Sequence, residues 1–98
     1  MRYRISEKAI ADLEQIWLYT YTNWSLDQAD RYHKQIINEI EYIAVNIEYG
    51  RNMDHVRLGY KMTKVKSHLI FYREIDIHTV EVIRILHQNM DIENRLKE

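Results

Sequence analysis

Two apolar segments near the end of the chain constrain its fold more than any other feature. Residues 68–74 and 80–87 are rich in β-branched and aromatic side chains, and a short polar segment separates them. Runs of this length and spacing predict an antiparallel pair of strands, buried on at least one face. Three basic side chains, Arg73, Arg84 and His87, interrupt the apolar character and are therefore candidate site residues.

The first half of the chain has the spacing of two amphipathic helices. Ser6 can cap a helix over residues 7–22, where apolar side chains recur every three or four positions. A second helix is expected over residues 26–47, because Ser25 and Gln28 have the spacing of a capping box. The connection is only a few residues long, so the two helices should pack as an antiparallel hairpin.

The remaining elements complete a small sheet. Residues 2–5 and 57–62 are expected to be strands beside the two apolar segments, and a short helix or tail should follow residue 90. Gly50 is expected to end the second helix as a left-handed cap. Strict alternation along 80–87 would place Arg84 on the same face as Val82.

This order predicts an α+β fold with one domain over residues 1–98. The helical hairpin should cover one face of a small, mainly antiparallel sheet and leave the other face open for a partner or substrate. The expected core residues are Leu13, Trp17, Ile36, Ile40, Phe71, Val82 and Ile85.

The composition and motifs of the chain exclude several kinds of metal-binding and nucleotide-binding site. The chain has no cysteine, which excludes disulfides and thiolate metal sites, and it has no glycine-rich phosphate loop or metal-binding histidine motif. We therefore expect no metal and no cofactor. The apolar runs are too short to span a bilayer, which favours an intracellular protein.

Charge is distributed unevenly along the chain, although the net charge is only −1. Residues 6–48 carry eight acidic and three basic side chains, whereas residues 51–73 carry six basic side chains and one acidic. The basic segment could attract a phosphate backbone or an acidic protein segment, or it could be a solvated strand face. Its candidate binding residues are Arg51, Arg57, Lys61, Lys64 and Lys66.

Several local sequences together resemble the ParE branch of the RelE/ParE superfamily of bacterial toxins. They are Ala11-Asp12-Leu13-Glu14-Gln15-Ile16-Trp17, Gln28-Ala29-Asp30-Arg31-Tyr32, Tyr49-Gly50-Arg51, His68-Leu69-Ile70-Phe71-Tyr72-Arg73 and Arg84-Ile85-Leu86-His87-Gln88-Asn89-Met90-Asp91. They occur in the family's order over about 90 residues. The resemblance implies a RelE/ParE-like fold and a cytoplasmic bacterial toxin of a type II toxin–antitoxin module.

The resemblance also implies partners. A ParD-like antitoxin would neutralise the toxin in a hetero-oligomeric complex, and DNA contact would come only through that complex. ParE toxins are understood to poison DNA gyrase, and the family's C-terminal segment matters for that inhibition. The residues expected to bind the target are therefore Arg73, Arg84, His87, Gln88, Asn89 and Met90.

RelE toxins of similar fold instead cleave mRNA on the ribosome. Such cleavage needs a base for the 2′-OH, a cation for the developing charge and an acid for the leaving oxygen. Arg84, His87 and His68 are the only candidates, and no tyrosine follows the last strand, so the catalytic set is incomplete. The alternatives are a ribosome-dependent endoribonuclease or an inactive antitoxin-binding relative.

Each candidate also has a structural interpretation. An arginine within an apolar strand, such as Arg84, is expected to have an ion-pair or backbone partner that holds the C-terminal tail. His68 and His87 lie near apolar segments, where histidines are usually hydrogen-bonded structural residues.

Overall fold

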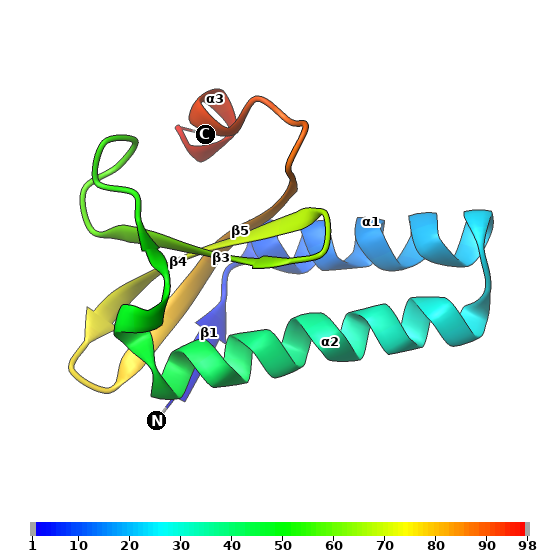
Figure 1. Cartoon of the computed structure of the whole chain (residues 1–98), viewed down its shortest axis with the longest axis horizontal. Helices are drawn as coiled ribbons and strands as arrows, with labels where there is room; N and C mark the ends of the chain where they lie inside the picture. The colour runs from blue at the N-terminus through cyan, green and yellow to red at the C-terminus, as the bar shows by residue number, and fades with distance from the viewer. Residues whose placement is uncertain (1, 98) are drawn as a thin grey trace.

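The computed structural model describes residues 2–97 and shows a five-stranded sheet with two long helices on one face (Figure 1). The elements are β1 (Arg2–Ile5), α1 (Glu7–Asn23), α2 (Leu26–Val45), the 3₁₀ turn η1 (Ile47–Tyr49), β2 (Arg51–Asn52), β3 (Tyr60–Val65), β4 (His68–Asp76), β5 (Thr79–His87) and α3 (Ile92–Leu96). The α+β fold predicted from the sequence is confirmed.

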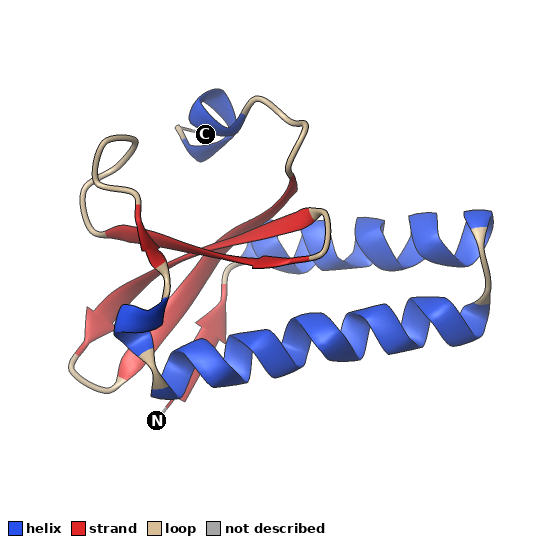
Figure 2. Ribbon diagram, viewed as in Figure 1, coloured by secondary structure: helices blue, strands red, loops and turns tan. Residues whose placement is uncertain are grey.

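The strand order is β1-β5-β4-β3-β2, with β1 parallel to β5 and all other neighbours antiparallel (Figure 2). The expected strand 57–62 was misplaced, because residues 57–59 belong to a turn and β3 runs from Tyr60 to Val65. The two-residue strand β2 was not predicted. Its length gives no periodicity that could be recognised in the sequence.

Local capping explains where the helices begin. The Ser6 hydroxyl accepts a hydrogen bond from the backbone N of Ala9 at 3.0 Å, and the Ser25 hydroxyl accepts from Gln28 N at 3.1 Å. Both caps were predicted. Helix α2 ends at Val45, two residues earlier than expected.

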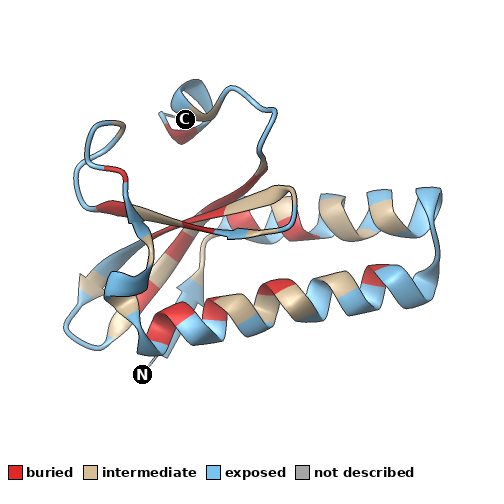
Figure 3. Ribbon diagram, viewed as in Figure 1, coloured by how far each residue is buried: buried red, intermediate tan, exposed pale blue. Residues whose placement is uncertain are grey.

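The helices and sheet enclose a core that contains Leu13, Ile36, Ile40, Val82 and Ile85, all buried as predicted (Figure 3). A second cluster lies on the opposite face of the sheet. It contains Met53, Tyr60, Phe71, Leu86 and Leu96. The expectation of an open sheet face was therefore only partly right, because α3 and the segment before β3 cover part of that face.

A β-bulge changes the expected alternation along β5. Phe71 pairs with Arg84 and Tyr72 with Val82, which leaves Ile83 as an extra residue. Val82 and Ile85 therefore both pack in the core beneath the helices, while Ile83 packs with the second cluster. Periodicity alone could not reveal this change, since each side of the bulge alternates normally.

Trp17 is only half-buried, so its assignment to the core was wrong. The helical hairpin extends beyond the edge of the sheet (Figure 1), and Trp17 belongs to the second half of α1. Its indole N donates to Asp30 Oδ1 at 3.0 Å, and its ring stacks on Tyr21 at 5.2 Å. The apolar stripe of α1 thus continues past the core onto an exposed surface.

Gly50 has φ −68° and ψ 157°, so the left-handed cap expected there is wrong. The glycine is instead required by the buried Tyr72, whose hydroxyl accepts from Gly50 N at 2.9 Å and donates to Ile47 O at 2.8 Å. A Cβ on Gly50 would lie 2.2 Å from that hydroxyl oxygen. Burial raises the pKa of Tyr72 to about 12, so the hydroxyl keeps its proton over the neutral pH range.

Replacing Gly50 by alanine is therefore expected to lower the free energy of unfolding by about 1–3 kcal/mol, as overpacking does. Urea denaturation followed by circular dichroism measures it. Arg51→Ala, at the next and exposed position, is the matched control and should change stability by less than about 0.5 kcal/mol. Equal stabilities for the two variants would contradict the role assigned to Gly50.

Candidate interaction surfaces

The exposed edge of β5 is completed by the start of α1. Strand β1 ends opposite Val82, so β5 has no strand partner on that side beyond this point. Ser6 takes over, because its backbone N donates to Val82 O at 3.0 Å and its hydroxyl to Ile83 O at 2.8 Å. Asp12 Oδ2 then accepts from Ile85 N at 2.9 Å. Side chains of α1 thus replace a missing strand.

Arg84 lies at the centre of this junction. Its Nε is 2.8 Å from Asp12 Oδ2, its Nη2 is 3.0 Å from Asp12 Oδ1, and its Nη1 donates to the carbonyl of Arg95 at 3.3 Å. Only 9% of the Arg84 side chain and 14% of the Asp12 side chain are exposed. Arg84 therefore connects α1, β5 and α3, and the structural partners expected for it are both present.

Asp12 was not among the residues singled out from the sequence. A signal for it existed, because Asp12 is three residues from Ala9 and four from Ile16, on the inner side of the first helix. An acidic residue on such a stripe requires a buried partner. Arg84, the arginine within the apolar segment 80–87, was the cation that could serve as this partner.

The two histidine candidates face one another at the end of the sheet. His68 and His87 pair across β4 and β5, with perpendicular rings 5.3 Å apart. The Tyr32 hydroxyl on α2 lies 2.6 Å from His68 Nδ1 and donates to Val65 O at 2.9 Å. Because the hydroxyl has one proton, we infer that His68 donates to it from Nδ1. His68 thus anchors α2 to the sheet.

Burial, with a smaller effect from His87, lowers the pKa of His68 below its usual 6.5. The unfolded chain then binds more protons than the folded one as the pH falls through 6.5, so stability should decrease there on acidification. Denaturation at pH 7.5, 6.5 and 5.5 measures this dependence. His68→Gln should flatten it. A wild-type chain that becomes more stable on acidification through this range would contradict the assignment.

Three of the predicted target-binding residues, Gln88, Asn89 and Met90, lie in one exposed loop between β5, which ends at His87, and α3. Gln88 N donates to Ser67 O at 2.8 Å, and Met90 N donates to His87 O at 2.9 Å. Asn89 N donates to the His87 ring at 3.1 Å. These bonds fix the backbone beside the turn between β3 and β4, while the side chains of Gln88, Asn89 and Met90 remain exposed.

Arg73 and Arg84 do not join this loop. Arg73 lies on the helix-free face of the sheet and pairs with Glu81, with its Nη2 3.1 Å from Oε1. Arg84 is buried against Asp12. The expected target-binding set is thus divided among three places.

The basic residues 51–66 are also dispersed. Arg57 donates to Leu96 O at 3.2 Å, Lys61 lies 3.6 Å from Glu48, and Lys66 lies over the Tyr32 ring at 5.6 Å. Lys64 points away from Lys61, since it is three residues along the same strand. Arg51 is on the edge strand β2. The structure does not gather these five residues into one patch.

The ribonuclease candidates are not placed together either. A cleft on the helix-free face is lined by Arg84, but neither His68 nor His87 lines it. Arg84 already holds a carboxylate through two nitrogens, and His68 is engaged by Tyr32. Among residues 2–97, no group of histidines and carboxylates could hold a metal ion, and no helix is long and apolar enough to cross a bilayer.

The helical hairpin carries an apolar surface with a hollow of about 510 Å³. The hollow is lined by Ile10, Leu13, Glu14, Trp17, Asp30 and His33. Further large apolar side chains are exposed on the two helices and the connection between them: Leu18, Tyr19, Tyr21, Trp24 and Leu26. Aromatic anchors around a hollow are typical of a protein interface.

Comparison with known proteins decides the family. Residues 3–92 match the family described as ParE toxin of type II toxin-antitoxin system, parDE. The chain belongs to the ParE toxin family. It is 41% identical over 95 residues to Toxin ParE1 of Mycobacterium tuberculosis, with 97% of each chain covered. It is 39% identical over 89 residues to Toxin ParE1 of Caulobacter vibrioides, with 91% of each covered.

A solved structure gives independent support for the ParE fold. The chain superimposes with a TM-score of 0.75 on a chain of the chromosomal ParDE TA system from P. aeruginosa. The match covers 89% of this chain and 95% of the other, at 18% identity. A ParE toxin of a ParDE system implies an antitoxin partner.

Proposed function

We propose that this ParE toxin inhibits DNA gyrase in the bacterial cytoplasm and that a ParD-like antitoxin neutralises it. Membership of the ParE family carries the proposal. The site geometry supports inhibition rather than RNA cleavage, because Arg84 is committed to Asp12 and no histidine shares its cleft. The same geometry argues against the alternative, a ribosome-dependent ribonuclease, because its candidate catalytic side chains do not line one cleft.

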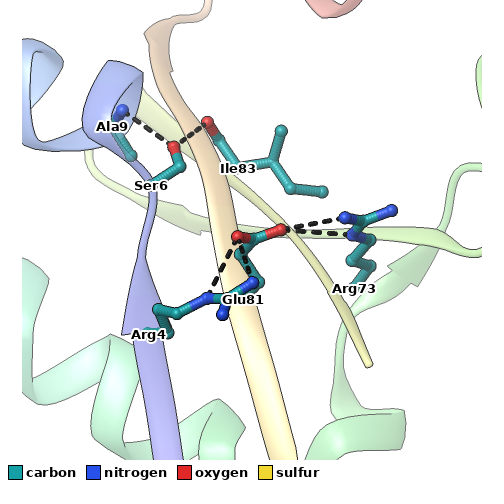
Figure 4. Close-up of polar contacts among 6 residues, drawn as sticks. All are labelled: Arg4, Ser6, Ala9, Arg73, Glu81 and Ile83. Atoms are coloured by element: carbon teal, nitrogen blue, oxygen red, sulfur yellow. Dashed lines mark hydrogen bonds and ion pairs between the residues drawn. The ribbon is translucent and has the colours of Figure 1, made fainter. Parts of the chain in front are cut away.

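The exposed loop Gln88-Asn89-Met90 is the proposed contact with gyrase. Its backbone is held by His87 and Ser67, so its side chains are presented without the entropic cost of ordering a free tail. Arg73 and Arg84 contribute differently in this proposal. Arg84 holds α3, the helix that follows the loop, through its hydrogen bond to the Arg95 carbonyl. Arg73 lies outside the loop and pairs with Glu81 (Figure 4).

The antitoxin is proposed to place an amphipathic segment on the helical hairpin. The exposed aromatic residues and the hollow beside Trp17 supply apolar contacts, while the scattered basic side chains supply charged ones. Such a combination favours fast association that weakens as the salt concentration rises. The resulting hetero-oligomer would contact DNA only through its antitoxin.

The test uses the loop in the full-length chain. Replacing Gln88, Asn89 and Met90 together by alanine should abolish growth arrest and gyrase inhibition while antitoxin binding and thermal stability stay near wild type. Growth curves after induced expression and a supercoiling assay measure the effect. The control replaces Glu7, Lys8 and Ala11 of α1 by Gln, Gln and Ser, respectively, and should remain toxic.

Deleting all residues after His87 is a weaker version of this experiment. The deletion should also abolish toxicity, but it removes Leu96, which is buried against the second cluster, and so it exposes apolar surface. Full toxicity of the loop variant, in a protein that remains folded, would overturn the proposed gyrase contact.

A further inference from the structure

His87 is the last residue of β5 and holds the loop that follows it through a ring nitrogen. The backbone N of Asn89 donates to His87 Nδ1 at 3.1 Å, two residues along the chain. An Asx turn has the same arrangement, in which the side-chain oxygen of an asparagine or aspartate accepts from the N–H two residues later. His87 Nδ1 is therefore the acceptor of a local turn at the start of the loop Gln88-Asn89-Met90.

This hydrogen bond defines the protonation state of the His87 ring. A neutral imidazole has one nitrogen that donates and one that accepts, whereas both nitrogens of the charged form donate. Because Nδ1 accepts from Asn89 N, it carries no proton, and the proton of the neutral ring is on Nε2. A second proton would have to bind at Nδ1, where it would face the N–H of Asn89.

The groups that contact the two histidines from neighbouring elements are aromatic or basic. The His68 ring on β4 lies perpendicular to the His87 ring at 5.3 Å. Tyr32 on α2 has its hydroxyl 2.6 Å from His68 Nδ1. Lys66, in the turn between β3 and β4, has its Nζ 5.6 Å from the centre of the Tyr32 ring. A positive charge on His87 would therefore lie beside a histidine and at the same end of the sheet as a lysine.

No acidic side chain compensates a charge at this position. Asp12 on α1 is the carboxylate whose charge acts on His68, and Arg84 already binds both of its oxygens. Neither His68 nor His87 forms an ion pair within the described residues 2–97. Protonation of His87 at Nδ1 thus removes its hydrogen bond with Asn89 without forming an ion pair in return.

We propose that His87 is a proton-sensitive positioning residue: its neutral ring holds the Asn89 amide in the loop conformation that contacts gyrase, and protonation at Nδ1 releases that amide and weakens the contact. This inference rests on the proposed function, because it requires that the loop touches the target. A proton that binds the released loop better than the fixed one shifts the population toward the released form. Histidine side chains change charge between about pH 5 and 8, so the release should occur on mild acidification.

The loop, rather than the ring, is the part that can move. Rotation of the His87 ring would break its contact with His68, and both residues belong to paired strands. Asn89 is exposed, so its N–H can turn toward water. The two neighbouring hydrogen bonds of the loop join backbone groups that do not titrate, which limits the change to the peptide of Asn89.

The direct test measures solvent exchange of the Asn89 amide by NMR at pH 7.5 and 5.5, corrected for the intrinsic exchange rate at each pH. Protection of Asn89 should fall about fivefold at pH 5.5, as for the loss of one hydrogen bond, whereas that of Gln88 should stay within about twofold. His87→Asn is the matched variant, because its side-chain oxygen can accept from Asn89 N and does not titrate. It should keep the protection at both pH values, and His87→Ala should lack it at both.

The variant His68→Gln separates the roles of the two histidines. It should flatten the pH dependence of stability, yet the response of the Asn89 amide should remain, because the accepting nitrogen belongs to His87. Circular dichroism melts check that each variant is folded at both pH values. Loss of the amide response in a folded His68→Gln protein would assign the proton to His68 and overturn the role of His87.

The consequence for the target is measured as the affinity of purified gyrase for the chain, by calorimetry at the same two pH values. At pH 5.5, His87→Asn should bind about fivefold more tightly than the wild-type chain, and at pH 7.5 the two affinities should agree within about twofold. Comparing the two chains at one pH cancels any titration of gyrase itself.

Two results would overturn this inference alone. One is unchanged protection of Asn89 in the wild-type chain between pH 7.5 and 5.5. The other is equal affinity of the wild-type and His87→Asn chains at pH 5.5 when both bind gyrase at pH 7.5. Absence of gyrase binding by the wild-type chain at pH 7.5 would instead overturn the proposed function, and the effect of His87 on the target with it.

Discussion

Replacing Asp12 by alanine is expected to lower the free energy of unfolding by about 3–5 kcal/mol, the typical cost of removing one partner from a buried ion pair. The substitution leaves the guanidinium of Arg84 buried without its carboxylate and removes the acceptor of Ile85 N. It also separates α1 from the edge of β5, which no strand covers there. Urea denaturation followed by circular dichroism measures the change.

Two further variants identify the cause of that loss. Glu14→Ala, at an exposed position two residues along the same helix, should change stability by less than about 0.5 kcal/mol. Adding Arg84→Met to Asp12→Ala should recover much of the stability, because the buried charge that lost the Asp12 carboxylate is then gone. A stable Asp12→Ala protein, or a double variant no better than the single one, would contradict the structural role given to Arg84.

Ile40→Ala should cost about 2–5 kcal/mol, because Ile40 is fully buried at the contact between α2 and the sheet. The loss combines the transfer free energy of the deleted methyl groups with the cavity left between helix and strands. The same denaturation experiment measures it.

The matched control for Ile40 is Val45→Ala at the exposed C-terminal end of α2. That variant should stay within about 0.5 kcal/mol of wild type. If Ile40→Ala retains wild-type stability, the packing of the hairpin on the sheet must differ from the one described.

The sequence predicted those parts of the fold that depend on neighbouring residues. Ser6 and Ser25 cap their own helices as expected, and the short helix or tail expected after residue 90 is α3. Alternation identified β4 and β5 because their apolar runs are long. The short strand β2 and the bulge at Ile83 give no comparable local pattern.

Errors arose where tertiary contacts decide a residue's role. Trp17 has the spacing of a core residue, but the hairpin extends past the sheet (Figure 1). An apolar stripe on a helix does not show where the sheet that packs against it ends. Gly50 was expected to be a left-handed cap, whereas its role is to leave room for Tyr72. That contact exists only in the folded chain, so the local sequence does not reveal it. The basic residues 51–66 are adjacent in sequence, but alternation and turns send them in different directions.

The candidate site shows the same division. The tail His87-Gln88-Asn89-Met90 was proposed as a unit from the family resemblance, and the structure places Gln88, Asn89 and Met90 in the loop that follows His87, the last residue of β5. Partners of Arg84 were expected in general terms, whereas Asp12 itself was missed. The row of Arg4, Glu81 and Arg73, in which both arginines pair with the glutamate (Figure 4), could not be predicted, because it depends on the register of β4 with β5 and on the pairing of β5 with β1, which is far away in sequence.

The most direct test of gyrase inhibition uses one preparation of the purified wild-type chain in two assays. The first measures gyrase supercoiling and the accumulation of cleaved DNA, and the second measures mRNA cleavage on purified ribosomes. The account predicts inhibited supercoiling with trapped cleaved DNA, reversed by the antitoxin, and intact mRNA. Codon-dependent mRNA cuts with unimpaired supercoiling would contradict it and would make Arg84, His87 and His68 catalytic candidates.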